Sequence, residues 1–550
     1  IDRGDVGLEL GHAAGADQRG GERHRAFLPF SFRGASRIDC LALRSRRSSG
    51  FIFNSATRPQ AKSALRVRRI VRTVHPPNLT ARSPPMHADR LRMRARSRNH
   101  GSALLVLAGL LCHAAPAAAQ PAVEIQINNT AETRDDYIGY SPTIARIRVS
   151  AANGATGTVP VVLRNLNPAV GGQIRFAPFQ DPWPAGTTAT RESIQLPVLA
   201  DGSWVQFVVA GQYMRPSTRD RDAVIVARTA GVGGATLGRK ELMVRVRKDA
   251  NTLTREERDL FLNALARLNA RGGYAVFQQI HSVVDSQAHS VESHTAYSFL
   301  PWHRAMLLAF ERALQSIEPA VALPYWRFDE PAPNVFSRDF MGAPPPPTGN
   351  TAQFSSTNPL SRWAIRGRQS AIERSPEFAP NKAPTVEGEF ATLQRAVFDG
   401  FRQMETNSHG PAHVQAAGGG WLGGAQTAVL DPLFFLLHAN VDRMWAKWQV
   451  ETKRFDPASD ASYTLQGSAP PGNCRLLGQY SQDTMWPWNG ATRPDDPCRP
   501  SIAPGGSFPA LAPGVFIPPQ QPRPHDMIEY RTAAAGLGGA GFSYHRVPFN

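Results

Sequence analysis

The segment from Asp431 to Arg443 has the sequence DPLFFLLHANVDR, in which one histidine, His438, stands within an apolar helical pattern. Aspartate followed by proline is typical of a helix start, because aspartate caps the first turn and proline lacks only an N–H that would have no partner there. The helical face that carries His438 is otherwise apolar, with Phe434, Val441, Trp445 and Trp448. An imidazole that faces a core needs partners for its nitrogens, and a metal ion would be one.

The segment from Ser293 to Arg304 has the sequence SHTAYSFLPWHR and carries a second histidine of this kind. His303 begins a stripe at helical spacing that continues with Leu307, Phe310 and Leu314. A single histidine on such a face is more often a residue of the core than a metal ligand. The prediction of a metal site therefore depends on how the histidines are grouped.

The chain has 15 histidines, and those of its helical region form two groups. One group precedes a loop rich in proline, serine and asparagine at about 331–384, and the other follows it: His281, His294 and His303, then His409, His413 and His438. Residues four apart, as in the pair that opens the second group, project from one face of a helix. A set of imidazole ligands suits zinc, copper, iron or nickel, and composition does not choose among them.

Both segments resemble the two copper signatures of the type-3 dicopper family, which contains tyrosinases, catechol oxidases and other polyphenol oxidases. The resemblance spans about 251–449. It implies two copper ions, each held by one group of three histidines. Within the first group His281 is preferred to its alternative His289, because it follows Tyr274 and Phe277 at helical spacing as the family's first ligand does. Asp442, one helical turn beyond His438, is expected to orient a ligand imidazole.

The resemblance implies a mainly α catalytic domain, a four-helix bundle that holds the dicopper site in its core. It also implies that O₂ and a phenolic small molecule are the partners, and that catechols are oxidised to o-quinones, with weak hydroxylation of monophenols. Two alternatives stay open from sequence: an oxidase of o-aminophenols, and a non-enzymatic oxygen-binding protein that resembles haemocyanin.

One departure from the family pattern bears on the choice of substrate. Glu405, four residues before His409, matches a glutamate that is thought to hold a water in members that hydroxylate monophenols. The asparagine that assists it there is replaced by Gly410. Glu405 is therefore expected to be catalytic, with only half of the water site present.

Other departures concern the surroundings of the copper ions. Glu292 stands where some eukaryotic members carry a cysteine bonded to histidine, so that crosslink is not possible. Leu437 replaces a histidine that many members have beside the ligand matched by His438. Only small residues occur at 423–425, where some relatives place a large side chain over the site, which predicts an open pocket.

The formal net charge of +17 is concentrated near the N-terminus. Residues 1–120 hold 21 of the 61 Lys and Arg but only 7 of the 44 Asp and Glu, which leaves +3 for the rest of the chain. A nearly neutral globular part does not favour a nucleic-acid partner.

The segment 86–119 has the pattern of a signal peptide, with arginines at 92–98, an apolar run at 103–111 and the small residues Ala117, Ala118 and Ala119. The run is shorter than the roughly 20 residues of a membrane span. We therefore expect a secreted or periplasmic protein without a membrane anchor after cleavage. Residues 1–85 are interpreted as upstream sequence outside the mature protein.

Three further regions follow the leader. Residues 120–248 alternate short β-branched runs with Gly, Pro and Asn, which predicts a β-rich, sandwich-like domain. Residues 249–455 form the predicted dicopper domain, with helices opening at Thr254, Pro301, about Leu393 and Asp431. Residues 456–550 are predicted to be loop-rich, and their cysteines, Cys474 and Cys498, suit a structural bridge.

Overall fold

The computed structural model describes residues 122–150, 156–181, 184, 187–284, 292–418, 420–488, 499, 521–531 and 542–549, all of which belong to one compact unit. The predicted leader, the upstream residues 1–85, His289 and Cys498 lie outside the described residues. Cys474 is disulfide-bonded.

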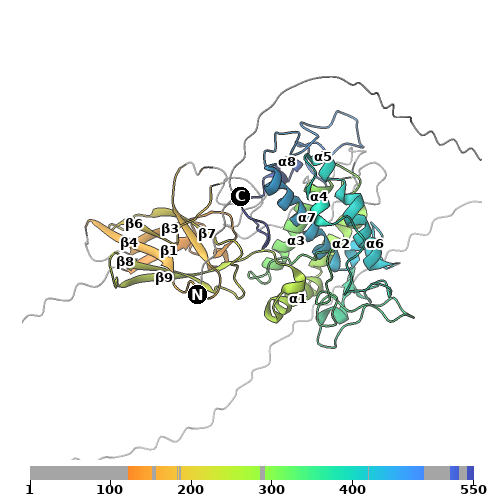
Figure 1. Ribbon diagram of the computed structural model, residues 1–550, viewed down its shortest axis with the longest axis horizontal. Coiled ribbons are helices and arrows are strands. Elements are labelled where there is room, and N and C mark those ends of the chain that lie inside the picture. The colour runs from red at the N-terminus through yellow and green to blue at the C-terminus, as the bar shows by residue number, and fades with distance from the viewer. Residues whose placement is uncertain are drawn as a thin grey trace, which may run out of the picture. The chain divides into compact units, whose positions relative to one another are not determined.

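The described residues between 122 and 244 form two antiparallel sheets, completed by one short parallel pair (Figure 1). The first sheet has the order β1-β3-β7-β5, with β1 (Ala122–Ile127), β3 (Thr143–Ser150), β7 (Val205–Gly211) and β5 (Ile174–Pro178). The second has the order β2-β9-β8-β4-β6, with β2 (Tyr137–Ile138), β9 (Thr236–Val244), β8 (Ala223–Thr229), β4 (Thr158–Asn165) and β6 (Ser193–Leu199).

Alternation of side chains explains how these two sheets share one core. In β3 every second residue is buried, which places Ala145, Ile147 and Val149 on the inner face. The opposite sheet contributes residues such as Leu163 and Ile225 to the same apolar cluster. The predicted β-rich region is confirmed. Sequence missed β2 and β5, because a two-residue strand has no readable alternation and β5 is a short run close to Gly171 and Gly172.

The helical region begins directly after a short turn at Ala250–Thr252. Its main helices are α1 (Arg255–Ala270), α2 (Gly273–Val284), α3 (Phe299–Gln315), α6 (Gly410–Ala417) and α7 (Leu433–Thr452). The predicted cap of α1 is present, because the Thr254 hydroxyl accepts from the Glu257 N–H and the Glu257 carboxylate accepts from the Thr254 N–H. The Asp431 carboxylate accepts from the N–H of Leu433, the first residue of α7, at 2.9 Å, although Pro432 and not Asp431 occupies the N-cap position.

The continuous helix expected to open at about Leu393 is wrong: α4 (Glu389–Leu393) ends at that residue, and only the short α5 (Phe398–Phe401) follows before Glu405. Between these two helices, backbone groups form hydrogen bonds with residues from distant parts of the chain. The Trp448 indole donates to the Arg395 carbonyl, and the Phe398 N–H donates to the Ala461 carbonyl at 3.0 Å. A distant partner at each of these positions outweighs local helical preference.

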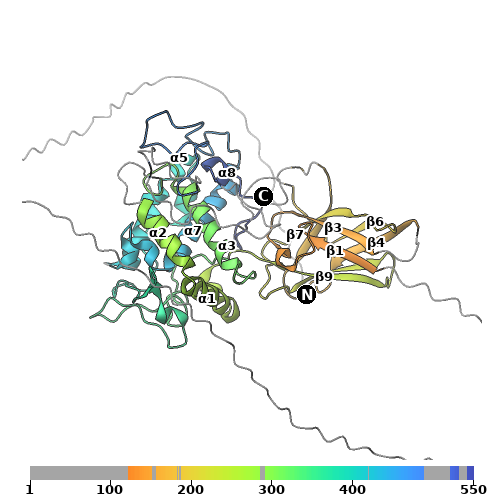
Figure 2. The ribbon, with the colours of Figure 1, turned by 180° about the vertical axis from the view of Figure 1, so that it is seen from behind.

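Helices α3 and α7 are neighbours, and they remain side by side with α2 when the view is turned by 180° (Figure 2). The rings of Phe310 on α3 and Phe435 on α7 stack with their centroids 3.5 Å apart, and Tyr274 of α2 packs edge-on against both. After α7 the described chain has few elements, among them α8 (Pro524–Ile528). None of the described helices combines the length and the apolar character that crossing a membrane requires.

Candidate metal centre

The six histidines singled out from sequence come from four helices and the turns next to them. His281 lies on α2, His294 lies in the turn before α3, and His303 lies on α3. The second group is spread over the π-helical turn Glu405–His409, α6 and α7, which carry His409, His413 and His438. Helix packing therefore brings together histidines that lie up to 157 residues apart in sequence, as His281 and His438 do.

The structure brings these histidines into two compact groups. In each group of three, one possible ligand atom per histidine lies within 4.8 Å of the others. The groups adjoin each other, because the rings of His303 and His438 stack with their centroids 4.1 Å apart at an interplanar angle of 12°. Five of the six side chains are buried, and His294 is partly exposed.

Backbone carbonyls fix the orientation of three of these rings. Nδ1 of His303 lies 2.9 Å from the Phe299 carbonyl, and Nδ1 of His413 lies 2.7 Å from the Leu422 carbonyl. Nδ1 of His409 lies 3.1 Å from the Glu405 carbonyl. A carbonyl only accepts, so each Nδ1 carries the proton and each Nε2 keeps its lone pair for a metal.

Burial keeps these imidazoles neutral. Desolvation lowers the pKa of His303, His409 and His438 well below the usual value, and neighbouring imidazoles lower it further. Desolvation also lowers the pKa of His413, to about 4. A neutral imidazole is the form that binds a metal ion.

The donors fit a pair of metal ions. Nε2 of His438 approaches Nε2 of His409 to 3.3 Å and Nε2 of His413 to 3.2 Å. Nε2 of His303 is buried and has no hydrogen-bond partner. Three lone-pair nitrogens at such distances, and a fourth that is buried and unpaired, are the arrangement that a metal ion satisfies. Donors that are all imidazole suit copper among other transition metals.

Comparison with known proteins decides among these metals. Residues 271–451 match the common central domain of tyrosinase. A tyrosinase of Streptomyces antibioticus is 31% identical over 280 residues, which are 45% of this chain and 94% of that protein. This chain belongs to the tyrosinase family. A tyrosinase of Streptomyces lincolnensis is 33% identical over 281 residues, 44% of this chain and 99% of that protein. Hemocyanin 2 of Megathura crenulata is 27% identical over 242 residues, 41% of this chain and 7% of that protein.

Membership of the tyrosinase family defines the chemistry at a coarse level. The family binds two copper ions, and this chain has two groups of three histidines that could hold them. The family uses copper and O₂ to oxidise phenols, so this chain is a type-3 copper oxidoreductase with the tyrosinase-like fold.

The expected role of Asp442 in this tyrosinase-family site is corrected by its contacts. Its Oδ1 accepts from Nε of Arg304 at 2.5 Å. Its Oδ2 accepts from Arg247 at 3.1 Å and from the Tyr544 hydroxyl at 2.7 Å. Both oxygens thus bind partners other than a ligand imidazole. Because Arg304 directly follows His303, Asp442 links α7 to α3 next to the metal centre.

Glu405 connects the two histidine groups through the backbone. Its Oε1 accepts from the Thr295 N–H at 2.6 Å, in the turn that carries His294. Thr295 has a φ of 53°, which is unusual for a β-branched residue and is held in place by that bond. The carbonyl of Glu405 accepts from the Gly410 N–H across the π-helical turn. Turns of this kind are frequent at functional sites.

Two phenylalanines pack against the histidines of the tyrosinase-family centre. The Phe299 ring lies 4.8 Å from the His303 ring and 4.9 Å from the His409 ring. The Phe434 ring lies 4.7 Å from the His281 ring and 4.2 Å from the His438 ring. The helical period of the sequence places Phe434 on the face of His438, whereas Phe299 was missed because the helix was expected to open only at Pro301.

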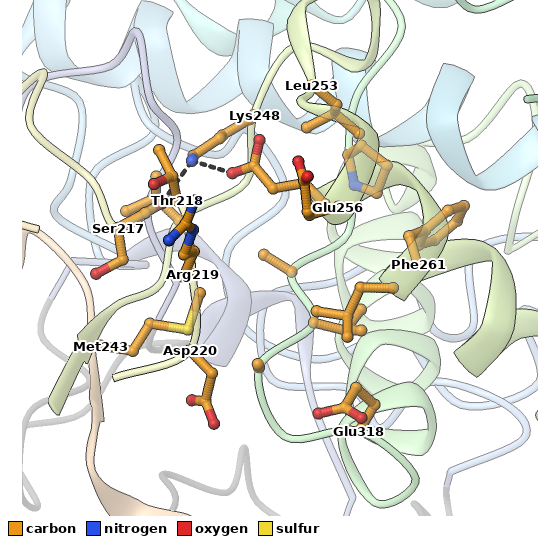
Figure 3. Close-up of a pocket in the computed structure, with 17 residues that line it drawn as sticks. Ser217, Thr218, Arg219, Asp220, Met243, Lys248, Leu253, Glu256, Phe261 and Glu318 are labelled. Atoms are coloured by element: carbon orange, nitrogen blue, oxygen red, sulfur yellow. Dashed lines mark hydrogen bonds and ion pairs between the residues drawn. The ribbon is translucent and has the colours of Figure 1, made fainter. Parts of the chain in front are cut away.

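A separate pocket of about 200 Å³ lies away from the histidines (Figure 3). It is lined by the loop at 217–220, by α1 and by the segment at 318–324, and no histidine contributes to it. At its rim Lys248 pairs with Glu257 and donates to the Ser217 carbonyl at 2.6 Å. This pocket is therefore distinct from the metal centre.

Proposed function

We propose that this protein oxidises catechols to o-quinones with O₂, and hydroxylates monophenols weakly or not at all. One copper would be held by His281, His294 and His303, and the other by His409, His413 and His438. Bound there, copper would supply the redox chemistry by which O₂ is reduced to water while two catechols lose two electrons and two protons each.

The contribution of the protein is to orient the ligands and to limit water. Carbonyls hold His303, His409 and His413 in the required tautomer. Phe299 and Phe434 cover the rings with apolar surface. The residues at 423–425 are exposed and small, which supports access of a phenolic ring.

The preference for catechols rests on the pair Glu405 and Gly410. A monophenol must lose its proton before it can bind copper as phenolate, and a general base assists only within hydrogen-bond reach, directly or through one water. Glu405 is the candidate base. Gly410 has no side chain that could hold such a water beside it, whereas a catechol is more acidic and depends less on this help.

Turnover of three substrates tests the proposal. The copper-loaded protein would be assayed with a catechol, the matching monophenol and the matching o-aminophenol, by following O₂ consumption. We expect the catechol to be turned over fastest. Equal rates on catechol and monophenol would contradict the preference, and a fastest rate on the o-aminophenol would favour the alternative substrate class.

Metal analysis tests the copper assignment separately. The purified protein should contain close to two copper ions per chain, and removal of copper by a chelator should abolish oxidation until copper is restored. Full activity with zinc, or with one copper ion per chain, would contradict the assignment.

We also propose that the mature protein is exported after cleavage near residue 119, with a β-rich domain at 120–248, the dicopper domain at 249–455 and a loop-rich segment at 456–550. Small residues before Gln120 and the basic and apolar pattern ahead of them support this. N-terminal sequencing of the protein recovered from the culture medium or periplasm should begin at or near Gln120, and recovery of residues 1–85 in that fraction would contradict the proposal.

A further inference from the structure

Arg312, a buried cation on α3 beyond the metal centre, has no counter-ion among the described residues. Arg312 is only 5% exposed, and its Nη1 has no hydrogen-bond partner. The described residues contain no ion pair to Arg312. A charged group taken out of water in this way is costly unless a partner of opposite sign is present.

The acidic residues nearby are already engaged. Glu311 pairs with Arg247 at 2.8 Å and accepts from the Leu323 N–H at 2.8 Å. Asp442 pairs with Arg304 and Arg247. These two carboxylates and two guanidinium groups balance each other, so the network has no negative charge left for Arg312.

Arg245 adds a further positive charge on the same side. Its guanidinium donates to the Pro319 carbonyl and lies over the Tyr137 ring, 4.5 Å from the centroid. The Tyr137 hydroxyl donates to Asp220 at 3.0 Å, and Asp220 pairs with Arg221 at 3.3 Å. The region around Arg245 and Arg312 therefore has an excess of positive charge.

A small cavity lies between these groups. Its volume is about 40 Å³, and its polar lining consists of Arg245, Arg247, Arg312, Gln315, Ser543, Tyr137 and one carboxylate, that of Glu311, which pairs with Arg247. The Ser543 oxygen accepts from the Tyr140 N–H at 2.9 Å, so its own hydrogen can be donated into the cavity. A space of this size admits one or two groups of about the size of water.

We propose that this cavity binds a small inorganic anion of the size of chloride, which neutralises Arg312 and joins α3 to the chain around β2 and β9. Three arginines and the Ser543 hydroxyl line the cavity against one carboxylate, Glu311, whose charge Arg247 offsets, and the volume excludes large organic anions. Burial lowers the pKa of Arg312 to about 9, with Arg245 and Arg247 lowering it further and Glu311 opposing them, which shows how unfavourable the charge is without a counter-ion. The site is independent of the proposed catechol chemistry.

Thermal unfolding of the copper-loaded full chain tests this site. Chloride would be titrated against gluconate at constant ionic strength, because gluconate is too large for the cavity. We expect a saturable rise of the Tm on the order of 2–5 °C in chloride. Crystals soaked in bromide should show anomalous scattering in the cavity beside Arg312.

Three variants separate this site from halide binding elsewhere, including at copper. Arg312→Met should lose the saturable chloride effect and, in gluconate alone, should unfold at the same temperature as the native protein or higher, because the uncompensated charge is gone. Arg312→Lys keeps the charge and should keep a chloride effect. The control Arg267→Met removes an exposed arginine of α1 and should respond to chloride as the native protein does.

Each outcome decides the proposal. A chloride effect that is abolished only by Arg312→Met, together with bromide in the cavity, supports it. The same Tm in chloride and gluconate for the native protein, or an undiminished chloride effect in Arg312→Met, would overturn it. The bromide measurement uses the native chain, so it stays decisive even if the methionine variant does not fold.

Discussion

At the scale of single residues, the candidate metal centre combines histidines held by backbone carbonyls with the proposed base Glu405. The ligands are held by carbonyls of their own and neighbouring turns, as for His409 with Glu405 and His413 with Leu422. Glu405 itself is tied to the Thr295 N–H. Gly410, whose N–H donates to the Glu405 carbonyl, is the position at which a side chain could change the balance between monophenol hydroxylation and catechol oxidation.

Gly410→Asn is expected to raise monophenol hydroxylation relative to catechol oxidation. The amide would supply the water partner that glycine lacks. A Cβ at Gly410 would lie 3.4 Å from the Glu405 carbonyl oxygen, an ordinary contact, and φ is −56°, so the substitution fits. Initial rates on a matched pair of substrates measure the ratio. Gly410→Ala is the control, since it adds a side chain without the amide, and an equal rise in that variant would contradict the explanation.

His303→Ala is expected to lower bound copper from two ions towards one per chain and to reduce catechol oxidation by at least about 100-fold, because one ligand of a metal site is lost. Metal analysis and O₂ uptake measure the two effects. His525→Ala is the control, since His525 is partly exposed on α8. Retention of both copper ions and full activity in His303→Ala would remove His303 from the ligands.

At the scale of elements, α3 and α7 are joined by a buried ionic network next to the ligands. Arg304 follows His303 on α3, Asp442 lies one turn after His438 on α7, and their side chains meet at 2.5 Å. Arg304 also lies over the Trp445 ring at 3.6 Å. The network therefore fixes the relative position of the two helices that carry His303 and His438, one histidine of each group.

Asp442→Asn should destabilise the fold by about 3 kcal/mol, because two buried arginines lose their shared carboxylate. Urea unfolding measures the free energy, and a copper titration should show weaker binding as the helices lose their fixed position. Asp399→Asn is the matched control: Asp399 pairs with Arg402 at 2.8 Å but is half exposed, so its loss should cost less than about 1 kcal/mol. Equal costs for both variants would show that the buried network has no special role.

At the scale of the whole molecule, segments that lie far from the histidines in sequence bind the buried ionic network beside them. The Met527 carbonyl accepts from Arg304 at 2.6 Å, and the Ile528 carbonyl accepts from Gln449 at 2.8 Å. The Tyr544 hydroxyl donates to Asp442, and Arg247, which follows β9, donates to Glu311. The chain before α1 and the chain after α8 thus meet at the network beside the metal centre.

Deletion of 521–550 is therefore expected to lower the Tm and to weaken copper binding, although it removes no ligand. Calorimetry and copper titration measure the two effects. Tyr544→Phe is the narrower variant, because it removes only the hydroxyl that donates to Asp442, and a hydrogen bond to a charged group contributes about 1.5–3 kcal/mol. Unchanged copper affinity in the truncated chain would contradict a supporting role for this segment.

The copper-free protein should lose stability as the pH falls below about 6.5. In the unfolded chain histidine has its ordinary pKa, whereas burial lowers the folded pKa of His413 to about 4 and that of three other ligands well below the usual value. The unfolded state then binds protons that the folded state does not, at up to about 1.4 kcal/mol per pH unit for each histidine. Urea unfolding at pH 7 and pH 5.5 measures this, and His413→Gln should make the slope shallower.

The sequence by itself determined the parts of this protein that depend on local periodicity and on long, specific motifs. Short β-branched runs predicted the seven longer strands, the Thr254 cap predicted α1, and the position of the histidines along the chain predicted two groups of three. The tertiary structure decided which residues meet across the chain. Asp442 binds arginines because α3 packs on that face of α7. The helix expected after Leu393 does not form because its backbone groups are hydrogen-bonded to distant residues. Local patterns carry no information on such partners, which are set by packing between segments that lie far apart in sequence.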